Sequence, residues 1–254
     1  MVVRLASAAE YAAQVQKEQS WLPVVAPLLP LPISMPLKRG NPSLEYPFEW
    51  SIYTWIEGET ATPESIDNLV GCAVTLAGFL NALYRIDTAG GPCAGPHNFY
   101  RGGSLAVYDT QMKEALMLLE DEIKANILKS MWEKAVNSVW NKAPVWVHGD
   151  VSAGNLLVKQ GRLSAVIDFG CMAIGDPACD LVIAWTLFKG ESRKAFHNSF
   201  YFDEPVWDRA RGWALWKALI TSTELIDATF SEKEKAASII DEIIIEYQSQ
   251  KENA

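Results

Sequence analysis

Two carboxylates and one amide, Asp150, Asn155 and Asp168, lie in one short stretch of the sequence around an expected β-hairpin. Oxygen ligands of this kind suit a hard cation such as Mg²⁺, which prefers a few protein oxygens together with substrate phosphates. Clustered acids repel one another, so the group would be unfavourable without a cation. The residue types therefore predict a magnesium site that works on a phosphate-bearing substrate.

The hairpin explains how the chain would bring these side chains together. Two apolar runs flank the turn candidate Gln160-Gly161. If the residues next to that turn face each other, Asn155 lies close to Val166 and within two positions of Asp168, because paired strands are about 5 Å apart. We expect both side chains at the open end of the hairpin, beside the polar turn that carries Asp150 and follows a short buried strand at 145–147.

The same stretch resembles the aminoglycoside phosphotransferase family of small-molecule kinases. His148-Gly149-Asp150 and Asn155 have the spacing of a kinase catalytic loop, and Ile167-Asp168-Phe169-Gly170 supplies the metal-binding acid before Phe-Gly. Further family-like stretches cover most of the chain, at residues 3–5, 21–23, 53–59, 95–103 and 175–180. The combined spacing is specific, whereas any one piece alone would be weak.

This resemblance implies an α+β, protein-kinase-like fold of two lobes. Residues 1–58 would form a truncated N-lobe and hinge, and residues 59–254 a mainly helical C-lobe with the catalytic loop and the metal-binding hairpin. The implied activity is ATP-dependent transfer of the γ-phosphoryl group to a hydroxyl of a small molecule, with Mg²⁺ as the second cofactor. The sequence does not choose among acceptors such as aminoglycosides, macrolides, choline or homoserine.

The resemblance also assigns roles to individual residues. Asp150 would take the proton of the acceptor hydroxyl, and Asn155 and Asp168 would hold the metal. The residues assigned to the nucleotide are Arg4, Glu18, Trp55, Ile56, Glu57, Leu157 and Ile167, with Arg4 and Glu18 expected to pair. Those assigned to support of the catalytic loop are His148 and Asp180, and those assigned to the acceptor are Asp176, His97 and Arg101.

Each assignment has an ordinary structural alternative. The three oxygen-bearing residues could cap local turns, Asp176 could cap the helix that follows it, and Arg4 and Glu18 could be solvent-facing charges. His148 is expected to hold its turn by hydrogen bonding rather than to act as a base or metal ligand. The tryptophans at 207, 213 and 216 are expected in the core rather than in a substrate pocket.

The start of the chain lacks one kinase feature. The first glycine is Gly40, so the glycine-rich loop that covers the ATP phosphates has no counterpart. The sequence leaves open whether the chain is a fragment or a natural short form. Because phosphoryl transfer depends on positioning and charge stabilisation, we expect reduced or absent activity. Turnover of about 1–100 per second, as in ordinary kinases, would contradict this expectation.

Composition narrows the function classes. The 254 residues are 49% hydrophobic and 21% charged, which suits a soluble globular protein of one or two domains. A net charge of −9 argues against general nucleic-acid binding. The four cysteines show no CxxC pair, and neither a signal peptide nor a membrane span is visible, so we expect reduced thiols and a cytoplasmic protein. The oligomeric state stays open.

Two other functions stay open beside the kinase. A nucleotide-binding pseudokinase or scaffold protein would keep the fold and the metal acids without transferring phosphate. A metal-assisted hydrolase would use the same acids to activate water on a phosphate ester. No GxSxG or HExxH motif supports other hydrolytic chemistry.

The hydrophobic periodicity predicts the elements that position these residues. Strands are expected at residues 1–5, 33–38 and 49–56, and helices at 8–23, 63–86, 108–118, 120–141, 178–188, 206–226 and 232–247. Ser7 and Thr62 are candidate N-caps for the first two helices, with Pro63 at the first helical position of the second. Residues 251–254 are expected to fray.

Overall fold

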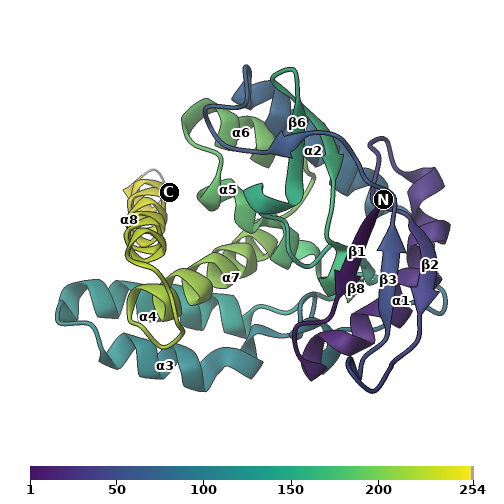
Figure 1. Cartoon of the computed structure of the whole chain (residues 1–254). Helices are drawn as coiled ribbons and strands as arrows, with labels where there is room; N and C mark the ends of the chain where they lie inside the picture. The colour runs from purple at the N-terminus through teal and green to yellow at the C-terminus, as the bar shows by residue number, and fades with distance from the viewer. Residues whose placement is uncertain (253–254) are drawn as a thin grey trace. The chain divides into compact units, whose positions relative to one another are not determined.

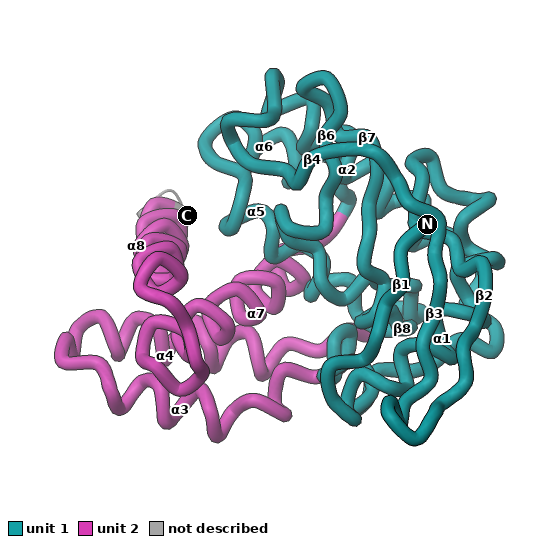
Figure 2. The backbone as a smooth tube through the Cα atoms, in the orientation of Figure 1, with its two compact units in different colours: residues 1–103, 142–201 teal, residues 104–141, 202–254 magenta. Residues whose placement is uncertain are grey.

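The computed structural model describes residues 1–252, and the chain divides into two compact units. Unit 1 comprises residues 1–103 and 142–201, and unit 2 comprises residues 104–141 and 202–254 (Figure 2). The predicted lobes, 1–58 and 59–254, follow a different division and stay a prediction. The fraying expected at the C-terminus lies outside the described residues at 253–254, whereas residues 251 and 252 belong to the last helix.

A three-stranded antiparallel sheet with the order β1-β3-β2 forms one part of unit 1 (Figure 1). Its strands are β1 (Val2–Leu5), β2 (Pro36–Gly40) and β3 (Trp50–Tyr53), which confirms the three strands predicted in this region. Helix α1 (Ala9–Val25) packs against β2 and β3 and continues into the 3₁₀ turn η1 (Ala26–Leu28). Its buried side chains recur at helical spacing, which explains why this face covers the sheet.

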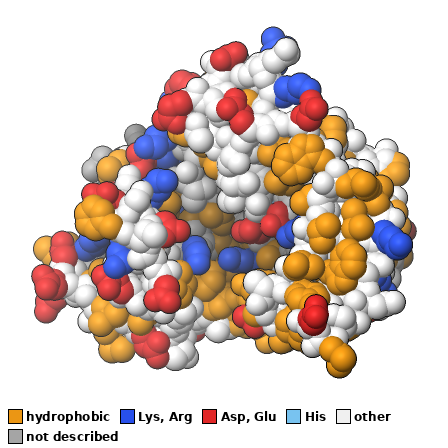
Figure 3. Space-filling model, viewed as in Figure 1, with side chains coloured by type: hydrophobic (Ala, Val, Ile, Leu, Met, Phe, Trp, Pro, Cys, Tyr) orange, Lys and Arg blue, Asp and Glu red, His pale blue; other side chains and the backbone are white. Residues whose placement is uncertain are grey.

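The two faces of this sheet differ in polarity and burial. On β3 the side chains of Ser51 and Tyr53 are buried, while Val3, Leu5 and Leu37 of the neighbouring strands are 54%, 59% and 52% exposed. Figure 3 shows hydrophobic side chains gathered over these strands. Side chains alternate between the faces of a sheet, so the buried set of β3 meets α1 and the exposed apolar set faces outward.

The predicted hairpin forms β6 (Leu156–Lys159) and β7 (Arg162–Val166), and β4 (Glu59–Thr60) adds a third strand beside β6. Gln160 and Gly161 form the turn with φ values of 52° and 70°, the left-handed pair typical of a two-residue hairpin. Lys159 faces Arg162 as expected, but a bulge between Leu157 and Val158 shifts the register. Asn155 therefore meets Ile167, not Val166: its carbonyl oxygen accepts from the Ile167 N–H at 2.9 Å.

The rest of unit 1 packs around the turn at residues 148–150, which carries Asp150. Strand β5 (Val145–Val147) pairs with β8 (Ala173–Gly175), and α2 (Leu69–Leu83) packs against β5, β7 and α6 (Gly190–Asn198). Short 3₁₀ turns connect these elements: η2 (Pro96–Asn98), η4 (Ala153–Asn155), η5 (Phe169–Cys171) and η6 (Pro177–Val182). The helix predicted at 178–188 is instead η6 followed by the single turn α5 (Ile183–Thr186).

The predicted N-cap at Thr62 is wrong. Helix α2 begins six residues after Pro63, and Asn68 caps it by accepting from the Gly71 N–H at 2.9 Å. The hairpin holds the backbone that precedes α2. The Ala61 N–H donates to the Leu156 carbonyl at 2.9 Å, and the Asp67 N–H donates to the Gly161 carbonyl at 3.0 Å. These long-range bonds override the local signal. Ser7 is likewise not the cap of α1, whose N-cap position is Ala8 with no side-chain bond.

Unit 2 is helical. It consists of η3 (Leu105–Tyr108), α3 (Asp109–Met117), α4 (Glu122–Asn137), α7 (Glu204–Ser222) and α8 (Phe230–Glu252). Helix α7 packs against α3, α4 and α8, and Trp207, Trp213 and Trp216 on it are 2%, 1% and 5% exposed, which confirms the prediction that they belong to the core. Within the described residues, no helix is both long and apolar enough to cross a membrane.

Candidate active site

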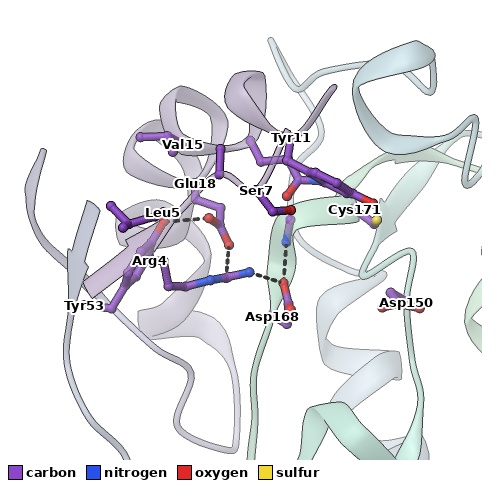
Figure 4. A pocket seen from close by; sticks show the side chains of 13 residues that line it. Arg4, Leu5, Ser7, Tyr11, Val15, Glu18, Tyr53, Asp150, Asp168 and Cys171 are labelled. Atoms are coloured by element: carbon purple, nitrogen blue, oxygen red, sulfur yellow. Dashed lines mark hydrogen bonds and ion pairs between the residues drawn. The ribbon is translucent and has the colours of Figure 1, made fainter. Parts of the chain in front are cut away.

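A pocket of about 270 Å³ in unit 1 brings Asp150 and Asp168 to one cavity (Figure 4). Arg4 from β1, Glu18 from α1 and Tyr53 from β3 share its wall. The remaining lining residues are Leu5, Ala6, Ser7, Tyr11, Gln14, Val15, Gly170 and Cys171. This volume is slightly below the range of about 300–1,000 Å³ that is usual for small-ligand pockets.

Asp150 and Asn155 are joined directly. The Asn155 side-chain N–H₂ donates to the Asp150 backbone oxygen at 2.8 Å and to its carboxylate Oδ2 at 3.0 Å. Both amide hydrogens are thereby directed to one residue, which orients the amide and turns its Oδ1 away from Asp150. The Asp150 side chain is exposed to solvent.

Asp168 is the second aspartate of the pocket, and its backbone is unusual. Its φ of 63° lies in the left-handed region, which a non-glycine residue rarely occupies. The Asp168 carboxylate accepts from the Gly170 N–H at 3.4 Å and forms an ion pair with Arg4 Nη2 at 2.7 Å. These contacts aim the carboxylate into the same cavity as Asp150 (Figure 4).

Arg4 and Glu18 pair as expected, at 3.2 Å between Nη1 and Oε1. Burial favours the neutral form of Arg4, but the carboxylates of Glu18 and Asp168 outweigh it and raise the Arg4 pKa. Burial raises the pKa of Glu18, and the charge of Arg4 and a hydrogen bond from Tyr53 offset part of that effect. Glu18 is only 3% exposed, so its charge depends on these two partners.

His148 and Asp180 stabilise the turn that carries Asp150 through hydrogen bonds, and both are fully buried. The His148 ring accepts from the Asp150 N–H at Nδ1 (3.2 Å) and contacts the Ile167 carbonyl at Nε2 (2.9 Å), so Nε2 carries the proton. The Asp180 carboxylate accepts from the backbone N–H groups of His148 at 2.9 Å and Gly149 at 2.7 Å. Burial raises the Asp180 pKa, and these two backbone hydrogen bonds offset part of that rise.

The other five residues assigned to the nucleotide lie apart from this cavity. The described residues that line the pocket do not include Trp55, Ile56, Glu57, Leu157 or Ile167. Trp55 is 65% exposed, Leu157 is buried at 8%, and Glu57 forms an ion pair with Lys159 at 3.2 Å. Their role at the nucleotide stays a prediction.

The three residues assigned to the acceptor also lie outside the pocket lining within the described part of the chain. Asp176 accepts from the Ala178 N–H at 3.1 Å and so caps η6, which is the capping role that the sequence offered as an alternative to acceptor binding. His97 contacts the Cys93 carbonyl through Nε2 at 2.9 Å and Lys17 Nζ through Nδ1 at 3.0 Å. The charge of Arg101 partly offsets the burial that raises the Cys171 pKa to about 11.

Three residues in or beside the site received no role from the sequence analysis. Tyr53 contacts Glu18, Lys17 contacts His97, and the fully buried Asn98 links its own loop to the segment after Asp168. Asn98 accepts from the Gly95 N–H at 2.9 Å and donates to the carbonyls of Arg101 at 2.8 Å and Cys171 at 3.1 Å. The alternation within β3 could have indicated the inward side of Tyr53, whereas the other two contacts join segments far apart in sequence.

The donor set fits a magnesium ion that is shared with phosphates. The Asp168 carboxylate and the Asn155 side-chain oxygen are hard oxygen ligands, whereas thiolate and imidazole groups suit softer metals. Among the described residues, no group of three or more His, Cys, Asp and Glu side chains forms a self-sufficient metal cage. Mg²⁺ usually binds to one or two carboxylates and completes its shell with water and phosphate oxygens, so no such cage is required.

Comparison with known proteins agrees with this geometry. A family model described as "Phosphotransferase enzyme family" matches residues 1–213. The chain belongs to this family. An aminoglycoside 3'-phosphotransferase of Escherichia coli is 30% identical to this family member over 170 residues, which cover 61% of the chain and 60% of that relative. The chain thus matches about 60% of the length of this curated relative.

Solved structures show the fold of this phosphotransferase family member. A GDP and kanamycin complex of APH(2")-IIIa has a TM-score of 0.73 at 18% identity, with coverage of 95% of this chain and 85% of that chain. A streptomycin–ATP complex of APH(2")-IIa has a TM-score of 0.58 at 19% identity, with coverage of 95% and 83%. These matches confirm the predicted α+β, kinase-like fold.

Proposed function

We propose that this phosphotransferase family member transfers the γ-phosphoryl group of ATP to a hydroxyl of a small molecule. The observation that carries the proposal is the shared cavity of Asp150 and Asp168, with Asn155 bonded to Asp150 and Arg4 beside Asp168. Phosphoryl transfer needs a base, a metal-holding acid and a cation near the phosphates, and this arrangement offers all three. The nucleotides bound to the similar proteins, GDP and ATP, support nucleotide use.

In the proposed reaction, Asp150 accepts a hydrogen bond from the acceptor hydroxyl and takes its proton. The hydroxyl oxygen bonds to the γ-phosphorus as the bond to the β–γ bridging oxygen breaks, and ADP leaves. Asp168 and Asn155 would hold Mg²⁺, which when bound neutralises charge on the phosphates. Arg4 adds a fixed positive charge, oriented by Glu18, beside Asp168 in the same cavity.

Two further assignments belong to this proposal. The boundary between the lobes lies near residue 58, since residues 54–58 have no regular secondary structure and could act as a hinge. A cytoplasmic location is consistent with four free thiols: Cys72, Cys93, Cys171 and Cys179.

The test is acceptor-dependent formation of ADP from MgATP, or of GDP from MgGTP. The acceptor panel begins with kanamycin and streptomycin, which the similar proteins bind, and adds macrolides, choline and homoserine. Asp150→Asn should lower turnover by about 100-fold or more, because general-base catalysis contributes at least that factor, while MgATP affinity stays within about threefold. Glu114→Gln, an exposed acid on α3, is the matched control and should leave both quantities unchanged.

Other outcomes would replace the proposal with a different function. MgATP binding without transfer to any acceptor would favour a pseudokinase or scaffold. Phosphate release at a rate that no acceptor increases would favour a hydrolase. If the protein binds no nucleotide and forms no ADP, the proposed function is wrong.

A further inference from the structure

Tyr53 lies at the end of a chain of polar contacts that leads to the metal-binding acid (Figure 4). Its hydroxyl donates to Glu18 Oε2 at 2.6 Å, and both side chains are almost completely buried. Glu18 Oε1 accepts from Arg4 Nη1 at 3.2 Å, and Arg4 Nη2 reaches Asp168 at 2.7 Å. The two oxygens of Glu18 therefore serve two different partners.

The phenol of Tyr53 keeps its proton, so it can only donate to this carboxylate. Burial and the adjacent negative charge of Glu18 raise the pKa of Tyr53. The aromatic ring also lies close to the cation, with Arg4 Cζ 5.8 Å from the ring centroid. Tyr53 thus contacts both members of the Arg4–Glu18 pair.

Because the two oxygens of Glu18 bond to different partners, the direction of the Arg4 side chain is fixed. A guanidinium and a free carboxylate prefer a bidentate pairing through two parallel hydrogen bonds. With Oε2 occupied by Tyr53, Glu18 holds Arg4 through Nη1 alone, and Nη2 remains directed to the cavity and Asp168. Without the hydroxyl, Oε2 would be a buried acceptor that lacks this donor, and a bidentate pairing would draw Arg4 toward α1.

We propose that Tyr53 is a positioning residue of the phosphotransferase site, whose hydroxyl keeps one oxygen of Glu18 occupied so that Arg4 faces the phosphates. This inference rests on the proposed function. It predicts a specific fault in the Tyr53→Phe variant, which keeps the ring and removes only the hydroxyl. The binding energy contributed by the phosphates should fall, while that contributed by adenosine should not.

The test compares the dissociation constants of MgATP and adenosine by calorimetric titration of the whole chain. Tyr53→Phe should weaken MgATP binding about tenfold, the factor expected for a displaced charge contact, and leave adenosine binding within about twofold. Tyr201→Phe is the control, since the Tyr201 side chain is fully exposed and does not line the pocket, so the loss of its hydroxyl should change neither constant. Because Tyr53 acts through Glu18, adding Tyr53→Phe to Glu18→Gln should weaken MgATP binding no further.

Three results would overturn the inference while the proposed function stands. They are unchanged MgATP affinity in Tyr53→Phe, an equal loss for MgATP and adenosine, and full additivity with Glu18→Gln. If the unaltered protein binds MgATP no more tightly than adenosine, the phosphate site itself is wrong, and the proposed function falls together with the inference.

Discussion

At the scale of single residues, the site depends on how charges are compensated in partly buried places. Arg4 and Glu18 were predicted from a family resemblance, and the structure brings them into an ion pair. The partner of the second Glu18 oxygen could not be predicted, because a hydroxyl on a strand carries no sequence signal for the helix it meets. Sequence reasoning thus identified charged pairs more readily than the neutral group that orients them.

Lys17 gives a prediction about pH at this scale. It is 8% exposed and contacts His97, and burial lowers its pKa from 10.5 to about 8, while the negative charge of Glu18 opposes that shift. Below pH 8 the amine is charged in both the folded and unfolded states, so the cost of burying the charge is fully present. Between pH 8 and 10.5 the unfolded chain binds more protons, so the free energy of unfolding should rise with pH.

The measurement is denaturant unfolding of the protein and of Lys17→Met between pH 6 and 10. The stability of the protein relative to Lys17→Met should improve by about 2–3 kcal/mol across the alkaline half of this range and stay flat below pH 7. Other alkaline titrations, such as those of the buried thiols, are common to both proteins and largely cancel in the difference. A difference that does not change with pH would show that Lys17 keeps an ordinary pKa.

At the scale of elements, the turn at residues 148–150 is held by the buried carboxylate of Asp180. Asp180→Ala would leave the buried N–H groups of His148 and Gly149 without their acceptor, and each such loss costs about 1–3 kcal/mol. We expect a loss of about 3 kcal/mol in the free energy of unfolding, measured by urea denaturation.

The matched control is Asp121→Ala, which removes an exposed N-cap from α4 and should cost about 1 kcal/mol. Equal losses for the two aspartates would mean that Asp180 is no more than a local cap. A further check is proteolysis near Gly149, which should speed up in Asp180→Ala and not in the control.

The start of α2 gives a second prediction for an element. Asn68→Ala removes the observed cap and should lower the free energy of unfolding by about 1 kcal/mol. Thr62→Ala affects only an exposed turn, where Thr62 and Ser65 bond to each other, and should cost clearly less. The reverse order in thermal or urea unfolding would support the helix start predicted at Pro63.

The same region shows where prediction of elements from sequence reaches its limit. The turn and strands of the β6–β7 hairpin followed from Gln160-Gly161 and the apolar runs. The strand β4 did not, because it depends on pairing between segments about 100 residues apart. The bulge after Leu157 lies within the hairpin itself, but the apolar runs carry no signal for it. Local signals therefore placed the candidate site, but not its register to within one residue.

At the scale of the whole chain, the predicted fold is confirmed by structures with TM-scores of 0.73 and 0.58. The prediction was possible because motifs spread along the chain, from Arg4 to Asp180, follow the order of the family pattern. The division into compact units was not predicted, because it depends on which helices pack together in three dimensions. A motif order reveals the fold class, but it does not reveal the packing of the helices that carry no motif.

Nucleotide binding should be visible as stabilisation of the whole protein. A ligand that binds only the folded state adds about 2.7 kcal/mol at a concentration 100 times its dissociation constant. MgATP should therefore raise the melting temperature, and Asp168→Ala should remove most of that shift because the variant loses a metal ligand. A shift of equal size in Asp168→Ala, or with ATP and EDTA in place of MgATP, would contradict the proposed metal site.

Asn98 ties the loop at residues 95–103 to the backbone of Cys171, only three positions beyond Asp168. Any molecule that displaces this loop must also strain the segment that carries Asp168, the proposed metal ligand. Thermodynamic linkage is reciprocal, so such a molecule and the nucleotide would change each other's affinity by the same factor. The side chain of Asn98 would then couple binding at the loop to binding of the nucleotide before phosphoryl transfer begins.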